Sequence, residues 1–223
     1  MIKESKTDAE TSVADRTSGE LATHIARVAA RLFAERGYDA TSVREIVEAA
    51  GVTKPTLYYH FGSKQGLAEA LLTKPMKQFV AALRDLISSE SDPIKLVRAM
   101  FANFIQFMAH EPDRSRFLYA ICFGPQNSSL RDEMHLFGEA IEAATADCSS
   151  RLAEAGLIDR ARIDACSQVI RGLIMSSTMD HIMVGFPLEP GLADRLVVDL
   201  LQGFGQPGCI AGDVPEQERG IPS

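Results

Sequence analysis

The sequence predicts an all-α protein with an N-terminal three-helix helix-turn-helix domain and a C-terminal helical domain. Apolar residues recur every three or four positions along most of the 223-residue chain, which is the period of amphipathic helices. Glycine and proline fall mainly between these segments and mark their ends. Near residue 50, only Gly51 and Val52 separate two such segments, and a connection this short forces the sharp crossing of a helix-turn-helix.

The first helix is predicted to begin near Gly19, after a polar segment, residues 1–17, that is expected to be a mobile tail. Gly37 ends this helix. Its apolar stripe comprises Leu21, Ile25, Val28, Ala29, Leu32 and Phe33. We expect the stripe to pack on the helix-turn-helix, which gives a domain of residues 18–65.

The second helix is predicted from Ser42 to Ala50. Ser42 and Glu45 have the spacing of a capping box, in which each side chain accepts a hydrogen bond from the other residue's backbone N–H. Thr41 is an alternative cap. Gly51 ends the helix, because a left-handed residue costs little only for glycine.

The third helix begins at Thr53, whose hydroxyl is the predicted cap, and Pro55 lies in its first turn, where a missing N–H costs no hydrogen bond. Leu57 and Phe61 are four residues apart and face inward. The residues left outside are Lys54, Thr56, Tyr58, Tyr59 and His60. Exposed tyrosines can bond phosphates and contact thymine methyl groups in a DNA major groove. The alternative is a helical pair whose tyrosines lie half buried.

Residues 51–64, Gly-Val-Thr-Lys-Pro-Thr-Leu-Tyr-Tyr-His-Phe-Gly-Ser-Lys, together with 32–38 and 41–43, resemble the DNA-binding domain of the TetR family of bacterial transcriptional regulators. The resemblance covers about Ala22–Leu72. It implies that the operator is contacted by Ser42, Arg44, Thr53, Lys54, Pro55, Thr56, Tyr58, Tyr59 and His60. It also implies that Lys64 contacts a DNA phosphate. For the remainder of the chain it implies a helical domain that dimerises and binds a ligand.

Charge is distributed unevenly along the chain, whose formal net charge is −7. Residues 16–77 contain 9 Lys and Arg against 6 Asp and Glu, so the acidic excess lies outside the helix-turn-helix. An acidic body discourages non-specific binding along DNA. No apolar run reaches the length of a membrane span and no secretory signal is evident, so a cytoplasmic protein with no membrane partner is expected.

The second domain, residues 66–203, is predicted to start with a long helix that Pro75 kinks or splits near Leu72. Such a joint could transmit movement between the domains, or it could be a bend that serves packing alone. Further helices are predicted from Pro93 to Glu111 and through Phe117–Phe123. Residues 204–223 are expected to be a disordered tail.

Two long helices, about 130–155 and 163–184, and a short one through Leu196–Leu201 complete this domain. The long helices carry small residues that permit close approach: Ala140, Ala144, Gly172 and Ser176. By the resemblance, these helices pair with their symmetry mates as a four-helix bundle. A homodimer is therefore expected.

Methionine and phenylalanine are concentrated in the second domain, and they provide soft, adaptable surface. The pattern suits a pocket for an apolar or aromatic effector and equally a plain core; the resemblance favours the pocket. The predicted ligand-binding residues are Phe101, Phe104, Met108, Phe117, Phe123, Met134, His135, Met175, Met179 and His181. Alternatively, His135 and His181 are hydrogen-bonded histidines at a helix surface and do not bind a ligand.

No catalytic constellation is evident, and we predict no enzyme activity, cofactor or metal. Gly-x-Ser-x-Gly, His-Glu-x-x-His and glycine-rich phosphate loops are absent. Asp180 and His181 are adjacent on a helix and diverge by about 100°, so they cannot orient each other. Four cysteines lack metal spacing and are interpreted as reduced thiols, with redox sensing as the alternative.

The sequence thus predicts a dimeric DNA-binding repressor that recognises a pseudo-palindromic operator in double-stranded DNA and is released by a small molecule. The alternative is a helical protein-interaction protein that retains a helix-turn-helix without an inducer response.

Overall fold

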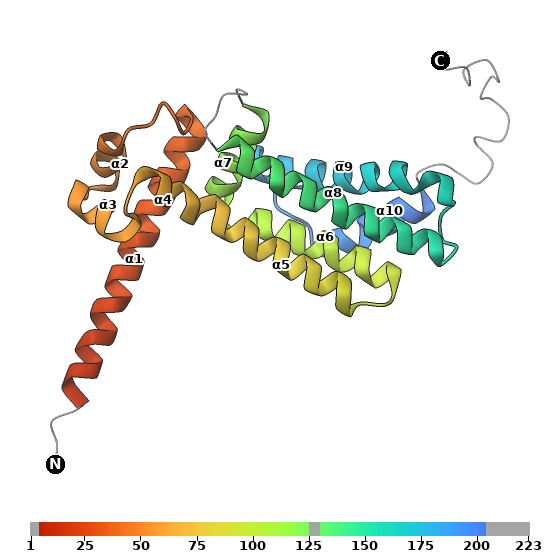
Figure 1. Ribbon diagram of the computed structural model, residues 1–223, viewed down its shortest axis with the longest axis horizontal. Coiled ribbons are helices and arrows are strands. Elements are labelled where there is room, and N and C mark those ends of the chain that lie inside the picture. The colour runs from red at the N-terminus through yellow and green to blue at the C-terminus, as the bar shows by residue number, and fades with distance from the viewer. Residues whose placement is uncertain (1–4, 125–129, 204–223) are drawn as a thin grey trace.

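The computed structural model describes residues 5–124 and 130–203, and all secondary structure within these ranges is helical. Figure 1 shows a small N-terminal domain beside an elongated helical body. The elements are α1 (Ser5–Arg36), α2 (Val43–Ala50), α3 (Lys54–Phe61), α4 (Lys64–Ala68), η1 (Glu69–Thr73), α5 (Lys74–Ser89), α6 (Pro93–His110), α7 (Pro112–Phe123), α8 (Arg131–Glu154), η2 (Arg160–Arg162), α9 (Ile163–Val184) and α10 (Leu192–Gln202). This order confirms the predicted all-α class.

The two parts share one continuous apolar core. In the N-terminal domain, α1 contacts α2 and α3; in the body, α8 lies against α5 and α9, and α10 packs on α6. The parts meet where α1 contacts α7. Phe33 of α1 lies with its ring centroid 4.9 Å from that of Phe117 in α7. The recognition domain therefore packs against the body mainly through α7, and the continuous α4–η1–α5 segment joins the two parts along the chain.

The first helix is longer than the sequence pattern predicts. It begins at Ser5 rather than near Gly19, and its N-terminal part projects away from the rest of the molecule (Figure 1). Residues 5–18 contain no proline or glycine, so nothing in the backbone stops the helix from continuing. Apolar periodicity reports only the packed part of a helix, and for this reason it placed the helix start too late.

The predicted break near Leu72 is a π-helix. The five residues Glu69–Thr73 form η1, which joins α4 to α5 directly. Pro75 lies in the first turn of α5, where it has no N–H to donate and where its ring would clash with the carbonyl four residues earlier in a regular helix. The wider π turn accommodates this conflict without a loop.

The remaining elements follow the predicted order. The 163–184 helix is confirmed as α9, and the 130–155 helix corresponds to α8. The predicted C-terminal tail, 204–223, lies outside the described residues. No helix in the described ranges combines the length and apolarity that crossing a bilayer requires.

Candidate nucleic-acid interface and cavity

The supporting helix α2 is fixed by its N-terminal cap. The hydroxyl of Ser42 accepts from the backbone N–H of Glu45 at 3.2 Å, and the Glu45 carboxylate accepts from the Ser42 N–H at 2.7 Å, so the predicted capping box is confirmed. Thr41 is buried and donates instead to the Gly37 carbonyl at 2.8 Å, which excludes it as the cap. The hydrogen bond from Ser42 holds the pKa of Glu45 below its usual value, and the charge of Arg36, 3.1 Å away, adds to this effect.

We expect Ser42→Ala to lower the free energy of unfolding by about 1 kcal/mol, because the backbone N–H of Glu45 loses the hydroxyl that accepts its hydrogen bond. Since the pKa of Glu45 is lower in the folded protein, its contribution is present at neutral pH and is lost as the pH falls through that folded value. Chemical denaturation at pH 7 and pH 3 measures both effects. The control is Ser91→Ala, in the exposed turn before α6, and an equal shift in the two variants would argue against the cap.

The recognition helix α3 is held by equally local contacts. Gly51 adopts φ 66°, the left-handed conformation that glycine permits. Thr53 accepts from the Thr56 N–H at 3.3 Å, and the two hydroxyls are 2.8 Å apart. Leu57 is fully buried beneath the helix. A Cβ on Gly66 would lie 2.1 Å from the Phe61 carbonyl oxygen, so glycine at that position allows α4 to approach the end of α3.

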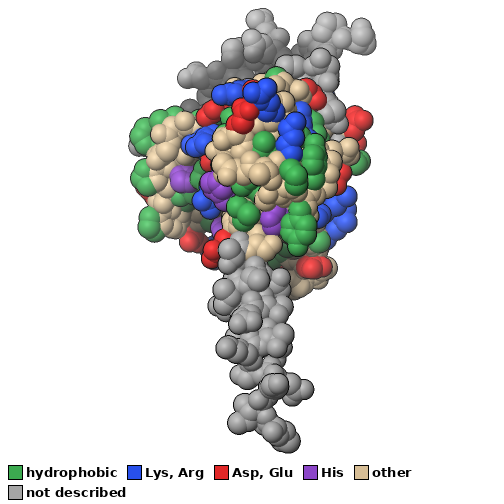
Figure 2. Space-filling view, turned by 90° about the vertical axis from the view of Figure 1, so that its left-hand side faces the viewer, with side chains coloured by type: hydrophobic (Ala, Val, Ile, Leu, Met, Phe, Trp, Pro, Cys, Tyr) green, Lys and Arg blue, Asp and Glu red, His purple; other side chains and the backbone are tan. Residues whose placement is uncertain are grey.

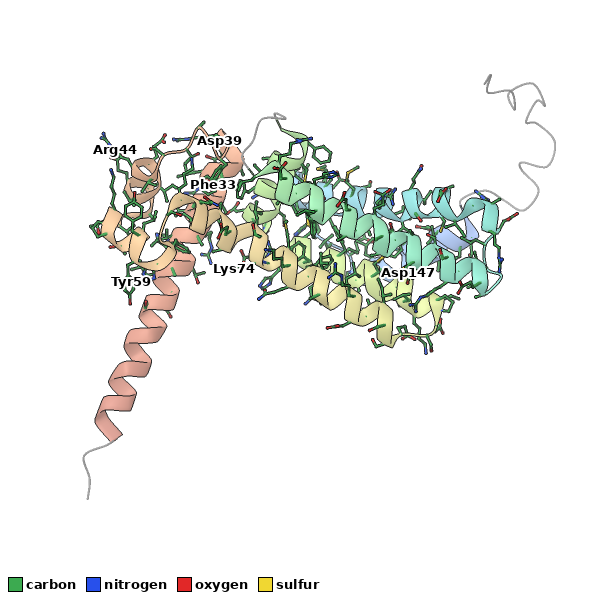
Figure 3. The ribbon with its side chains drawn as sticks, viewed as in Figure 1. Phe33, Asp39, Arg44, Tyr59, Lys74 and Asp147 are labelled. Atoms are coloured by element: carbon green, nitrogen blue, oxygen red, sulfur yellow. The ribbon has the colours of Figure 1, made fainter. Side chains whose placement is uncertain are left out.

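The outer face of α3 presents side chains that the core does not use. Tyr59 is 81% exposed and Tyr58 is 45% exposed, while Lys54 and Pro55 are also exposed. The alternative interpretation of half-buried tyrosines therefore does not hold for Tyr59. Figure 2 looks onto this side of the domain, where histidine and apolar side chains lie near the centre and basic and acidic side chains lie beside one another toward the upper edge. In Figure 3, Tyr59 and Arg44 lie on the outer side of the domain, away from the body.

Other residues of the predicted DNA-binding set are already engaged within the protein. Arg44 is exposed but pairs with Glu48 at 2.6 Å, and this partner raises the pKa of Arg44. His60 is half buried, with its ring 5.0 Å from that of Tyr59. The ammonium of Lys64 lies 4.3 Å above the ring of Tyr38, and burial lowers its pKa. Lys64 is thus set back from the face that carries Tyr59.

A cavity of about 210 Å³ lies between α6, α7, α8 and α9. Five of the predicted ligand-binding residues line it, namely Phe104, Met108, Phe123, Met134 and Met175. The remaining lining is mostly apolar and comprises Leu118, Tyr119, Cys122, Phe137, Gly138, Ile141, Arg171 and Ile174. The side chains of Phe123 and Met175 are 64% and 43% exposed, so the cavity reaches the surface.

The other five predicted ligand-binding residues do not line this cavity. Phe101 is fully buried in the core, and Phe117 is buried against Phe33, because α7 turns that side chain toward α1. His135 is exposed and lies 3.6 Å from Glu139. Met179 is half buried against the core. The ring of His181 bonds the Phe186 carbonyl oxygen at 2.7 Å, which matches the structural alternative for this histidine.

The predicted set lacked eight of the lining residues, and three of these eight, Gly138, Tyr119 and Arg171, shape the cavity. Gly138 lies inside the first half of the long helix α8, and an interior glycine was the one available signal. The Tyr119 hydroxyl shares a 2.8 Å hydrogen bond with Thr178 of α9, and Arg171 donates to Thr145 of α8 at 3.0 Å. These bonds connect α7 to α9 and α9 to α8 around the cavity.

The cysteines are free thiols in the described part of the chain, which includes Cys122, Cys148 and Cys166 but not Cys209. Burial raises the pKa of Cys148 to about 12, so its reactive thiolate is scarce at neutral pH. Burial also raises the pKa of Cys122. Within the described ranges, no three His, Cys, Asp or Glu side chains gather where they could hold a metal ion.

Comparisons with known proteins place this geometry in a family. Residues 25–71 match the model of bacterial regulatory proteins of the tetR family. The chain is 32% identical to the transcriptional repressor KstR2 of Mycobacterium tuberculosis over 99 residues, 43% of the chain and 50% of that protein. It is 34% identical to the transcriptional activator FasR of Mycolicibacterium smegmatis over 91 residues, 41% of the chain and 42% of that protein. The chain thus spans about half the length of the curated relatives it matches.

Solved structures extend the likeness beyond the recognition domain. The structure of the ketosteroid regulator KstR2 of M. tuberculosis has a TM-score of 0.68 at 22% identity and covers 84% of this chain and 94% of that one. The regulator FadR of Bacillus subtilis, described in complex with stearoyl-CoA, has a TM-score of 0.62 at 18% identity, with 82% and 99% covered. At these identities the structures show a common fold. Residues 25–71 therefore match the recognition domain of the tetR family of bacterial regulatory proteins, and the chain as a whole shares the fold of the solved regulators named above.

Proposed function

We propose that this protein is a transcriptional repressor that binds a pseudo-palindromic operator as a homodimer and is released by a small apolar ligand. The observation that carries the DNA-binding part is the outer face of α3, where Tyr59 is 81% exposed above a fully buried Leu57. A folded protein gains nothing in stability from such a side chain. In a major groove, the ring and hydroxyl would contact base edges and phosphates.

An electrophoretic mobility shift with the DNA upstream of the protein's own gene tests this part. We expect a sequence-dependent complex whose affinity falls as salt is raised, because phosphate contacts release counterions from DNA. Competition with shuffled DNA of the same composition separates specific from general binding. No complex at low salt would favour the alternative, a helical interaction protein that retains a helix-turn-helix.

The proposed dimer uses the outward face of α9. Gly172 and Ser176 are exposed there, beside the exposed apolar side chains Val169, Met175 and Met183. An apolar and small-residue stripe of this kind permits two helices to approach closely, and it is costly to leave in water. Ala144, which the sequence pattern placed on this face, is buried inside the protomer and contributes to its own core instead. Two copies are needed because one recognition helix contacts too few base pairs for useful specificity.

The proposed ligand occupies the cavity between α6 and α9, and α7 is the element that connects it to the recognition domain. Tyr119 and Cys122 of α7 line the cavity, while Phe117 of the same helix packs against Phe33 of α1. The Tyr38 ring also lies near Phe117, with a centroid separation of 6.5 Å, and carries Lys64 on its face. A shift of α7 on ligand binding would therefore move the packed base of the helix-turn-helix.

The interface between the two parts has room for such movement on one side. A groove of about 700 Å³ lies between α1, η1 and the junction of α6 and α7. It is lined by Arg27, Leu71, Pro75 and Arg114, among others. The domains are thus tightly packed at Phe33 and Phe117 but separated beside the π-helix. We propose that α1 pivots about the contact between Phe33 and Phe117. For a tenfold change in operator affinity, the ligand must bind the released conformation about 1.4 kcal/mol more tightly than the DNA-binding conformation.

Filling the cavity should abolish the ligand response and preserve DNA binding. We predict this result for Gly138→Leu, because Gly138 lines the cavity and a Cβ built there meets no atom within 4 Å. The control Gly138→Ala removes a helix-interior glycine and should raise the free energy of unfolding by about 1 kcal/mol while leaving the cavity open.

The measurement combines thermal shift with operator binding. Hydrophobic compounds that raise the melting temperature of the natural protein and of Gly138→Ala, and that weaken operator binding, should do neither with Gly138→Leu. An unchanged response in Gly138→Leu would place the effector elsewhere.

A further inference from the structure

The outward side of α2 carries an ion pair that the packing of the domain does not require. Arg44 and Glu48 are four residues apart on this short helix and lie on the side turned away from its buried residues, which are Ile46, Val47 and Ala50. The Arg44 Nε atom donates to a Glu48 carboxylate oxygen at 2.6 Å. The two side chains are 76% and 59% exposed. An ion pair in such surroundings adds little to the free energy of unfolding.

The order of the two charges is unfavourable for the helix itself. Arg44 is the second residue of α2, where the backbone carries partial positive charge, and Glu48 is the third from its end, where the backbone carries partial negative charge. A pair in the order acid then base would gain from both ends of the helix, and the observed order loses at both. Helix stability therefore does not explain why these two residue types occupy these two positions.

The other acidic residue on the outer turns of α2 has a clear role in folding. Glu45 accepts from the Ser42 N–H at 2.7 Å and so caps the helix, and it also pairs with Arg36 at 3.1 Å. In the part of the chain that the structure describes, the Glu48 carboxylate bonds only Arg44. The effect of Glu48 is therefore an effect on Arg44.

The bond leaves one edge of the Arg44 guanidinium free. It engages Nε, and within the described ranges neither Nη atom has a hydrogen-bond partner. These two atoms form an edge of the planar fork that can bond two acceptors, such as those on the edge of guanine, or the oxygens of a phosphate. Figure 3 shows Arg44 and Tyr59 on the same outer side of the domain. Arg44 thus lies beside the face that is proposed to meet DNA.

The Glu48 carboxylate affects phosphates and base edges differently. Phosphates occur along all DNA, so an arginine that bonds them adds to the binding of any sequence. A phosphate that approaches Arg44 has to displace the carboxylate or remain close to its negative charge, and either alternative is costly. Base-edge acceptors are uncharged, so they can bond the free Nη edge while Nε stays on Glu48.

We propose that Glu48 is a positioning residue that sets the DNA specificity of Arg44. It holds Arg44 through Nε and suppresses contacts of Arg44 with phosphates, so Arg44 contributes at base edges of the operator. This proposal rests on the proposed DNA-binding function and deepens it, because it assigns to an acidic residue the part of specificity that comes from weakening the binding of other sequences.

The test compares the natural protein with Glu48→Gln, which keeps a hydrogen-bond acceptor and removes the charge. Affinities for operator and for shuffled DNA are measured over a range of salt concentrations. We expect affinity for shuffled DNA to rise about fivefold, the effect of about one exposed ion pair, while operator affinity changes by less than about twofold. On shuffled DNA, the slope of log affinity against log salt should steepen by about one unit, because Arg44 gains a phosphate contact.

Two further variants identify the cause of this change. Asp194→Asn removes the same charge from an exposed ion pair on α10, where Asp194 lies 2.7 Å from Arg98, and should alter neither affinity nor slope. Glu48→Gln is also measured in an Arg44→Ala background, in which its effect on shuffled DNA should disappear. Denaturation curves show that each variant is folded.

The outcomes separate this inference from the proposed function. Unchanged affinity for shuffled DNA in Glu48→Gln, or an equal rise on operator and shuffled DNA, would overturn the inference while the repressor stands. A rise that persists in the Arg44→Ala background would also overturn it, because Glu48 would then act only through general repulsion. Failure of the natural protein to bind any operator would contradict the proposed function, and the inference with it.

Discussion

Gly172→Arg combined with Ser176→Arg should convert the protein to monomers and abolish specific operator binding. Both residues are exposed on α9 within the apolar stripe of Val169, Met175 and Met183. A dimer through this stripe would bring each arginine toward its own symmetry mate, and buried like charges repel strongly. The protomer itself should tolerate the change, because a Cβ at Gly172 meets no atom within 4 Å.

Light scattering at micromolar concentration measures the oligomeric state, and a mobility shift measures operator binding. The control is Ala82→Arg on the exposed side of α5, which adds the same kind of side chain away from α9 and should remain dimeric. A double arginine variant that stays dimeric would place the interface on another face. A natural protein that is monomeric at this concentration would remove the palindromic operator model as well.

The helix-turn-helix was predictable from sequence because short-range interactions determine it. The Ser42 and Glu45 capping box, the left-handed Gly51 and the Thr53 cap each depend on residues within four positions of one another. Such signals survive in any tertiary context. Similarly, Pro75 by itself signalled a break in the helix, although the form of that break, a π-helix, depends on how α4 and α5 pack.

The cavity was only half predictable, because periodicity does not tell which side of a buried helix faces which neighbour. Phe117 and Tyr119 are two residues apart on α7, yet one packs on α1 and the other lines the cavity. Methionine and phenylalanine content located the general region, but it could not separate Phe101 in the core from Phe104 at the cavity.

Tyr59→Ala should weaken operator binding about 5- to 150-fold and leave the stability of the protein unchanged. The side chain is 81% exposed, so its removal leaves no cavity and breaks no core contact. The loss of one base-edge contact costs about 1–3 kcal/mol, and it should reduce discrimination at one operator position. Lys54→Ala, at the start of the same helix, is expected to act in the same direction.

Two controls separate recognition from folding and from general attraction to phosphate. Leu57→Ala removes a fully buried side chain from the opposite face of α3 and should lower the free energy of unfolding by about 2–5 kcal/mol. Any loss of DNA binding in this variant should therefore match the fraction of protein that a denaturant titration shows to be unfolded. Lys64→Ala should weaken operator and shuffled DNA equally and reduce the slope of log affinity against log salt by about one unit.

The ratio of operator affinity to shuffled-DNA affinity therefore decides the role of Tyr59. A fall in this ratio, with unfolding curves that superimpose on those of the natural protein, assigns Tyr59 to base recognition. An equal loss on both DNAs would assign its hydroxyl to a phosphate, as many tyrosine contacts are. Unchanged affinity in both Tyr59→Ala and Lys54→Ala would mean that α3 does not enter the groove, and the exposed aromatic face would then require a protein partner to explain it.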